Sequence, residues 1–402
     1  MKNTKSLMPL VLSVGIFASP TFIPAQSGQS PTPVTTSGNK EAPTLTPAQA
    51  GAATLEKTRL VTAYGLEPFV QKLNDHGNLG YRLDKSLSYG GEGPTRSYAA
   101  VLQLDANNKY EYDWISTPDK RMLESQLNFQ AKQGFNFVTA HAITVCSKGS
   151  VVEVFSQKPI PPQIFRMKKG EAFLFERRNG STEQTREYRV FIAKAHLGDS
   201  AQKTIQAALE EAAQQGFRPV KVLFTRSGLL DFNVSALTEK DLKAGALPKI
   251  GYHFIKKTSG FREEVNTLAA QGGRFITGRR IGTIRMALMV KQANENEAAT
   301  YTFIDEKKYA KEFDKTVASG NSYRGVIVGD LSCGSEQVEN EELVFAQNSG
   351  GEKHEYKIHN LLITTAGDPT ADSLQEFNRL VGENFQIKDL FYFNGLKLIL
   401  EK

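Results

Sequence analysis

The nine-residue stretch QAKQGFNFV occupies residues 130–138, and a close copy, AAQQGFRPV, occupies residues 212–220. Three apolar residues lie eleven, seven and three positions before the glycine of the first copy: Leu123, Leu127 and Ala131. A spacing of four along one face predicts an amphipathic helix. Helices commonly end at a residue with a left-handed backbone, which glycine adopts freely. The letters QGF therefore predict a helix end followed by the start of a strand.

The same offsets recur along the rest of the chain. Matching apolar residues precede Gly216, Gly272 and Gly320, a weaker match precedes Gly80, and Asn384 stands in the place of the glycine near the C-terminus. Asparagine tolerates a left-handed backbone better than most residues with a side chain. The sequence therefore predicts six helices that end alike.

Strand patterns flank each predicted helix. Tyrosine-rich stretches such as YEYDWI from Tyr110 and YTFIDEK from Tyr301 precede the helices, and stretches such as GFRPVKVLF follow them. A further apolar stretch, such as MALMVKQ or LKLILE, closes the pattern. Alternation of β-branched or aromatic residues with polar ones is typical of half-buried strands. The predicted fold class is α+β, with tandem β-α-β-β repeats that form mainly antiparallel sheets and helices packed on one face.

Six repeats account for most of the chain. Their predicted bounds are 55–108, 109–185, 186–250, 251–298, 299–352 and 353–402. Two longer segments, KPIPPQIFRMKKG (158–170) and LTEKDLKAGALPK (237–249), are predicted to be loops because Pro and Gly interrupt them. A unit of about fifty residues is marginal alone, so neighbours should share a core. The sequence leaves open a continuous array or three pairs of repeats, and we favour pairs.

The repeat pattern resembles a known family. A Tyr-Glu-Tyr opening strand, an amphipathic helix, a Gly-aromatic strand and a final apolar strand ending in Lys or Arg are typical of small, single-unit bacterial domains of unknown function. The resemblance covers most of residues 58–402 and implies six tandem, divergent copies. That family has no established reaction or catalytic residues, so the resemblance implies no activity.

The N-terminus has the layout of a secretory signal peptide over residues 1–25. Lys2 and Lys5 precede an apolar run from Leu7 to Ala18. This run is shorter than the roughly 20 residues that span a bilayer, although an uncleaved membrane anchor remains an alternative. Residues 26–54 are rich in Pro, Thr and Ser and are predicted to be a disordered linker. We expect an exported protein, periplasmic or extracellular.

The chain holds two cysteines, Cys146 and Cys333. An oxidising compartment allows one disulfide between them, and two buried free thiols are the alternative. A framework of several disulfides is excluded.

No motif for catalysis stands out. His141 and Cys146 lie five residues apart on one predicted strand and so point to opposite faces. The stretch GGEGPT from Gly90 lacks the Lys-Ser/Thr of a phosphate-binding loop, and neither HExxH nor a zinc-ligand spacing occurs. We therefore predict no catalytic residue, no metal site and no cofactor.

Charge is distributed unevenly. The chain carries +6, whereas residues 301–402 hold 11 Lys or Arg against 17 Asp or Glu. A candidate anion-binding patch lies on one predicted hairpin: Arg274, Arg279, Arg280 and Arg285. An acidic run before a later strand is expected to be a solvated loop: Glu339, Glu341 and Glu342.

These features favour a non-enzymatic binding or scaffolding protein of the bacterial envelope or exterior. Its partner would be an acidic envelope polymer or protein, and no motif for specific nucleic-acid binding supports that class. One alternative is a hydrolase whose site forms between repeats and gathers carboxylates or histidines from both. Another is head-to-tail self-association between the acidic C-terminal part and the basic part.

Overall fold

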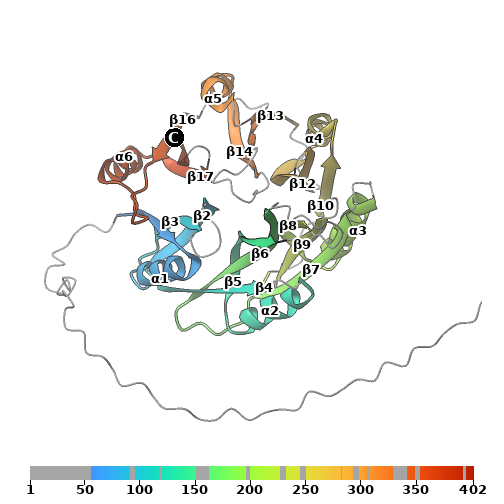
Figure 1. Ribbon diagram of the computed structural model, residues 1–402. Coiled ribbons are helices and arrows are strands. Elements are labelled where there is room, and N and C mark those ends of the chain that lie inside the picture. Colours follow the sequence, from blue (N-terminus) through green and yellow to red (C-terminus); the bar gives the residue numbers. More distant parts are fainter. Residues whose placement is uncertain are drawn as a thin grey trace, which may run out of the picture. The chain divides into compact units, whose positions relative to one another are not determined.

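The computed structural model describes residues 56–90, 96–117, 120–150, 163–195, 200–226, 232–244, 250–281, 283–292, 298–305, 308–328, 342–348, 354–392 and 395–402. The predicted signal peptide and linker lie outside these ranges. Within them, the order strand, helix, strand, strand occurs six times (Figure 1). We number these segments as repeats 1 to 6 and call their strands opening, second and third.

The elements of the six repeats follow the predicted order. The helices are α1 (Leu66–Gly77), α2 (Lys120–Lys132), α3 (Ser200–Gln214), α4 (Phe261–Ala270), α5 (Tyr309–Ala318) and α6 (Ala371–Gly382). The opening strands are β1 (Thr58–Tyr64), β4 (Tyr110–Thr117), β7 (Arg186–Ala195), β10 (Ile250–Lys257), β13 (Ala299–Asp305) and β16 (Tyr356–Leu361). The second strands are β2 (Tyr81–Tyr89), β5 (Asn136–Ser150), β8 (Arg218–Arg226), β11 (Arg274–Ile281), β14 (Asn321–Val328) and β17 (Gln386–Tyr392). The third strands are β3 (Ser97–Leu104), β6 (Gln163–Arg178), β9 (Phe232–Asp241), β12 (Ile284–Gln292), β15 (Glu342–Asn348) and β18 (Leu396–Glu401).

Each repeat forms a three-stranded antiparallel sheet with its third strand in the middle. The opening and second strands therefore lie at the two edges, and each helix packs against its own sheet (Figure 1). The second strands β11 and β14 also pair in parallel, which joins repeats 4 and 5 into one six-stranded sheet. The predicted α+β class with mainly antiparallel sheets is confirmed.

The predicted helix ends are also confirmed. All six residues at this position have a left-handed backbone, with φ of 85° at Gly134 and 69° at Asn384. In repeat 2, the amide of Phe135 then donates to the carbonyl of Gln130 at 3.1 Å, and the amide of Gly134 donates to Ala131 at 3.0 Å. These bonds satisfy carbonyls at the end of the helix and turn the chain into the second strand.

Every second strand carries a β-bulge four residues after the helix-ending residue, as at Val138 in β5 and Val220 in β8. A bulge bends its strand and leaves backbone groups without a partner in the ladder. The repeat sequence pattern gave no signal for this irregularity, because the bulged residue differs in type from repeat to repeat.

The hydrophobic core lies between repeats. Six buried clusters occur among the described residues, and five of them draw their side chains from two successive repeats. Leu209 of repeat 3, for example, shares a cluster with Tyr252 and Met286 of repeat 4. One cluster joins repeat 6 to repeat 1 through Phe377 and Val101. The contacts therefore form a closed cycle, and the favoured grouping into three pairs is wrong.

Further contacts between repeats 6 and 1 support the closure. The hydroxyl of Thr62 donates to the carbonyl of Gly367, and the Lys72 ammonium lies 2.7 Å from the Asp368 carboxylate. The rings of Tyr89 and Tyr392 stack with centroids 5.1 Å apart. A closed cycle gives every repeat two neighbours, so neither terminal repeat is left with an exposed apolar face.

Two predicted loops are partly strand. Residues 163–170 belong to β6, where they pair with β5 in an extended hairpin, and residues 237–241 belong to β9. Proline and glycine in these segments signalled a break, but the flanking residues retain partners across the ladder. The prediction of loops over the whole of 158–170 and 237–249 is therefore wrong.

Candidate functional site

Neighbouring repeats are joined by a side-chain amide that binds the outer edge of the next opening strand. Asn74 on α1 accepts from the Tyr112 amide at 2.7 Å and donates to the Tyr112 carbonyl at 3.0 Å. Asn128 makes the same two bonds, both at 2.9 Å, to the backbone of Tyr188. We call this pair of bonds the amide clamp. It satisfies an edge that would otherwise be open for pairing.

The amide clamp recurs at the next two junctions. Asn266 on α4 bonds both backbone groups of Tyr301. At the junction of repeats 3 and 4 the residue is Gln206, one turn earlier on its helix, which bonds the carbonyl of Tyr252 and the amide of Phe254. A longer amide from a different position thus reaches the same strand edge.

Repeat 5 lacks the amide. Asn74, Asn128 and Asn266 lie six residues before their helix-ending residues, and the residue at that position in repeat 5 is Asp314. An ionised carboxylate only accepts hydrogen bonds, so it cannot donate to a strand carbonyl. Asp314 is exposed, and no bond from it to β16 is present among the described residues.

The outer edge of β16 therefore has no clamping side chain. On its inner side, β16 pairs with β18. Glu355 and Lys402 exchange backbone hydrogen bonds of 3.1 and 2.8 Å, so the backbone groups of Tyr356 point to the opposite side. The same alternation turns out the backbone groups of Ile358 and Asn360. In the described part of the chain, no hydrogen bond to these outward groups is recorded.

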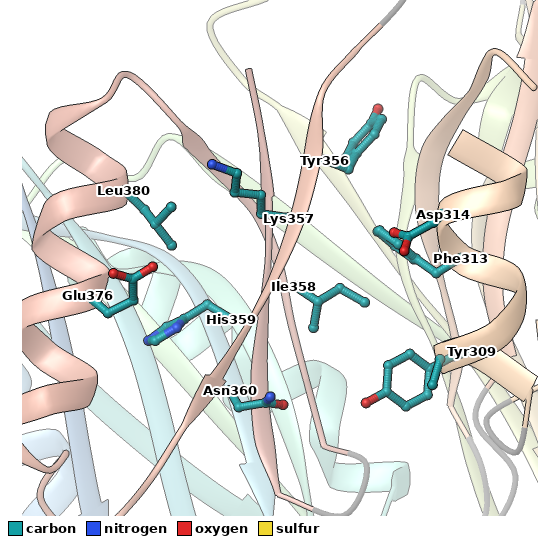
Figure 2. Close-up of a pocket in the computed structure, with 11 residues that line it drawn as sticks. Tyr309, Phe313, Asp314, Tyr356, Lys357, Ile358, His359, Asn360, Glu376 and Leu380 are labelled. Atoms are coloured by element: carbon teal, nitrogen blue, oxygen red, sulfur yellow. The ribbon is translucent and has the colours of Figure 1, made fainter. Parts of the chain in front are cut away.

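A pocket of about 410 Å³ lies along this edge, between α5 and α6 (Figure 2). Figure 2 shows Tyr356 and Ile358 directed toward α5, where Tyr309, Phe313 and Asp314 line the wall. On the α6 side, the lining residues are Lys357, His359, Glu376 and Leu380. The pocket thus combines an open strand edge with aromatic and charged side chains from two repeats.

The charged groups on the α6 side are engaged within the protein. Both carboxylate oxygens of Glu376 accept from Arg379 at 2.7 Å, which lowers the pKa of Glu376. The Nε2 of His359 donates to the Ser373 carbonyl at 3.1 Å, and burial lowers the pKa of this imidazole. His359 is therefore neutral at pH 7.

The predicted arginine patch has a structural partner. The Nε of Arg285 lies 2.7 Å from Oε1 of Glu342, and Nη1 of Arg280 lies 3.7 Å from the same oxygen. Glu342 is 0% exposed, so the expectation that it belongs to a solvated loop is wrong. A buried carboxylate requires compensating cations, which these arginines supply.

The other two arginines of the predicted patch, Arg274 and Arg279, differ from each other in exposure. Arg274 is exposed at the start of β11, whereas Arg279 is half-buried. Burial lowers the pKa of Arg96 in repeat 1, and the positive charge of Arg279 adds to this effect. The anion-binding role of the four arginines as one surface stays a prediction. Glu339, Glu341 and Cys333 fall outside the described residues, so the structure does not distinguish a Cys146–Cys333 bond from two free thiols.

The repeat pattern contains a signal for the pocket that helix spacing alone does not indicate. The position six residues before the helix end is Asn in repeats 1, 2, 4 and 6, Glu210 in repeat 3 and Asp314 in repeat 5. Only the structure shows that this amide binds the neighbouring strand in repeats 1, 2 and 4, and that Gln206 replaces it in repeat 3. In repeat 6, Asn378 donates instead to Oε1 of Glu56 at 3.2 Å.

Within the described residues, no group of three or more His, Cys, Asp or Glu is placed to hold a metal ion. No helix there is long and apolar enough to cross a membrane. Comparisons with protein-family models, curated proteins and solved structures found no match for this chain.

Proposed function

We propose that this chain is a non-enzymatic binding protein whose pocket between repeats 5 and 6 takes an extended peptide segment. The observation that carries the proposal is the open edge of β16, where the amide clamp is replaced by Asp314. Tyr356, Ile358 and Asn360 present backbone donors and acceptors at every second residue, about 7 Å apart. Another extended backbone has the matching spacing, which is the basis of recognition by strand addition.

The walls of the pocket give this ligand further chemistry. Tyr309 and Phe313 offer aromatic surface on the α5 side, and Asp314 adds an exposed carboxylate. Lys357 is held by Glu355 and Glu383 at 3.6 and 3.8 Å. The carboxylate of Asp314 is thus the charge left to meet the ligand, and it favours a peptide with a Lys or Arg side chain.

The test uses a random heptapeptide library displayed on phage, selected on the full chain. Selected peptides are then measured by fluorescence anisotropy against wild type and Asp314→Asn. Asparagine restores the amide clamp and covers the edge of β16, so we expect affinity to fall at least about tenfold. Asn266→Asp, which alters the clamp at the junction of repeats 4 and 5, is the matched control and should leave the affinity unchanged.

Backbone amide signals locate the ligand. Addition of a selected peptide should shift the amide resonances of Tyr356 and Ile358 more than those of Tyr112 and Tyr188. Selected peptides that bind Asp314→Asn as tightly as wild type, or that shift no amide of β16, would contradict the proposal.

A hydrolase remains the second candidate, because the pocket gathers Asp314 from repeat 5 with His359 and Glu376 from repeat 6. The pairing of Glu376 with Arg379 argues against a proton donor there, and the described residues that line the pocket include no Ser, Thr or Cys. His359→Gln would abolish hydrolysis of a peptide or glycan panel if this candidate were right. Absence of turnover by wild type across that panel would remove it.

We further propose an exported location, since residues 1–25 have the layout of a signal peptide. An envelope or extracellular protein would meet its peptide ligand, or the acidic partner expected from the +6 charge, outside the cytoplasm. Fractionation of cells that express the full chain tests this, and recovery of unprocessed protein in the cytoplasmic fraction would contradict it.

A further inference from the structure

The end of the pocket away from Asp314 holds a second charged group. Figure 2 shows Asn360 and Tyr309 at this end, and Tyr356 near Asp314 at the other. The exposed side chain of Asn360 accepts a hydrogen bond through Oδ1 from the ammonium of Lys397, which lies directly across from it on β18. The same ammonium lies 5.7 Å from the centroid of the Tyr309 ring. Both side chains that contact this ammonium therefore line the pocket.

Lys397 is a buried cation with no carboxylate beside it in the described part of the chain. The residue is 5% exposed, and its ammonium makes no ion pair with an acidic side chain of the described residues. Burial lowers the pKa of Lys397, and no acidic group there counteracts the effect. An ammonium has three N–H donors, and the Asn360 oxygen accepts from one of them. A buried charge in this state costs free energy that a carboxylate would offset.

Repeat 5 shows how a charge at the same position is met elsewhere in the fold. Four residues after the buried tyrosine of its opening strand lies Asp305, which pairs with Glu342 on the third strand. In repeat 6 the same count reaches Asn360, which pairs with Lys397. Glu342 and Lys397 thus occupy equivalent positions, and both contact the preceding repeat. Arg285 of repeat 4 lies 2.7 Å from Glu342, whereas the described residues of repeat 5 offer Lys397 an aromatic ring and no carboxylate.

The first turn of α5 adds positive potential at the same end of the pocket. Tyr309 and Ala310, the first two residues of this helix, are among the lining residues. Lys308 at the N-cap makes no side-chain capping bond. The amides of a first turn have no partner within the helix, and the helix dipole places partial positive charge there. The pocket is therefore electropositive around Asn360 and carries the Asp314 carboxylate at the other end.

We propose that the Asn360 end of the pocket binds a carboxylate of the peptide ligand, through the ammonium of Lys397 and the side-chain NH2 of Asn360. This inference rests on the proposed function and adds a second charge to the ligand. Tyr356 and Asn360 lie four residues apart, which is about 13 Å along a strand, and side chains at that spacing share one face. The ligand is thus a peptide with a Lys or Arg and a carboxylate about four residues apart. An Asp or Glu side chain and a free C-terminus would both supply that carboxylate.

Synthetic versions of the selected peptides provide the test on the ligand side. Each is made with an amidated or a free C-terminus, and its Asp and Glu residues are replaced one at a time by Asn and Gln. Against the wild-type chain, removal of the carboxylate about four residues from the basic side chain should weaken binding at least about tenfold in fluorescence anisotropy. A loss on amidation assigns the carboxylate to the C-terminus, and a loss on replacement of Asp or Glu assigns it to a side chain. Wild-type protein suffices for these measurements, so they do not depend on the folding of a variant.

Lys397→Met tests the protein side, because methionine is similar in length and carries no charge. Its affinity for the carboxylate peptide should fall at least about tenfold, while its affinity for the neutralised peptide should equal that of wild type. Lys402→Met, which removes an exposed ammonium from the end of the same repeat, is the control and should bind both peptides like wild type. The Tm of Lys397→Met should be no lower than that of wild type, since the substitution removes a buried charge that has no carboxylate partner.

The outcomes separate this inference from the proposed function. Peptides that bind and shift the amides of β16, but lose no affinity when their carboxylates are removed, would overturn the carboxylate site and leave strand addition intact. Equal affinity of Lys397→Met and wild type for the carboxylate peptide would do the same. Absence of any peptide that binds the wild-type chain would overturn both.

Discussion

A buried tyrosine in four of the opening strands accepts a hydrogen bond from a backbone amide of the preceding repeat, and we expect this bond to stabilise the fold. Tyr188 is fully buried, and its hydroxyl accepts from the amide of Phe137, next to the bulge of the preceding repeat, at 2.7 Å. Tyr112, Tyr301 and Tyr356 accept from the matching amides at 2.7, 2.8 and 3.1 Å. We call this bond the tyrosine latch.

Tyr252 cannot form the latch. The matching residue in the preceding repeat is Pro219, which has no backbone N–H. The hydroxyl of Tyr252 makes no hydrogen bond within the described part of the chain, and burial raises its pKa to about 12. The fold thus holds its own control, a buried tyrosine in the same place without the bond.

Tyr188→Phe removes the acceptor and leaves the buried Phe137 amide without a partner, which should cost about 1–3 kcal/mol. Tyr252→Phe removes a hydroxyl that has no partner, so it should be nearly neutral. A difference of about 2 kcal/mol corresponds to roughly 3 °C in Tm for a folded chain of this size.

Thermal unfolding followed by circular dichroism measures this difference, and hydrogen exchange of the Phe137 amide locates it. Exchange at Phe137 should accelerate in Tyr188→Phe and stay unchanged in Tyr252→Phe. Equal Tm values for the two variants, with Phe137 still protected in Tyr188→Phe, would refute the latch.

Further outcomes follow from other contacts. Glu342→Gln should cost about 3–5 kcal/mol, because it leaves buried guanidinium groups without their carboxylate, whereas Glu355→Gln at an exposed pair should cost under about 1 kcal/mol in urea unfolding. His141 is neutral in the folded chain down to about pH 3, whereas in the unfolded chain it binds a proton below about pH 6.5. The free energy of unfolding should therefore fall as the pH decreases from about 6.5 to about 3. His141→Gln should reduce the slope of this pH dependence by up to about 1.4 kcal/mol per pH unit. Asn384→Gly should stabilise by roughly 0.5–1 kcal/mol at its left-handed position, while Gly134→Ala should destabilise, since a Cβ there would lie 2.4 Å from the Ser181 carbonyl oxygen.

Local features of the fold were readable from the sequence. Gly134, Gly216 and Asn384 mark helix ends because the left-handed backbone is a property of one residue and its neighbours. The four-residue spacing of Leu123 and Leu127 likewise identified buried positions, and both are fully buried. Helices, strand order and antiparallel class follow from such short-range rules.

Contacts between repeats were not readable in the same way. In the sequence, Glu342 resembles a solvated acid, because its ion-pair partner Arg285 belongs to another repeat. The choice between pairs and a closed cycle depends on whether Phe377 meets Val101, which lie far apart in the chain. Asn74 and Asp314 likewise occupy equivalent positions and differ only in an amide NH2 against a carboxylate oxygen. The effect of that difference, a hydrogen bond to the neighbouring opening strand or its loss, is visible only in the structure.

The most direct test of the open edge at β16 needs no substitution. Hydrogen exchange of the wild-type chain should show slow exchange at the outward amides of Tyr112, Tyr188 and Tyr301, which donate to a clamping asparagine, and exchange at Tyr356 faster by at least about tenfold. Equal protection of all four amides would mean that the edge of β16 is covered, and the account of the pocket would be wrong.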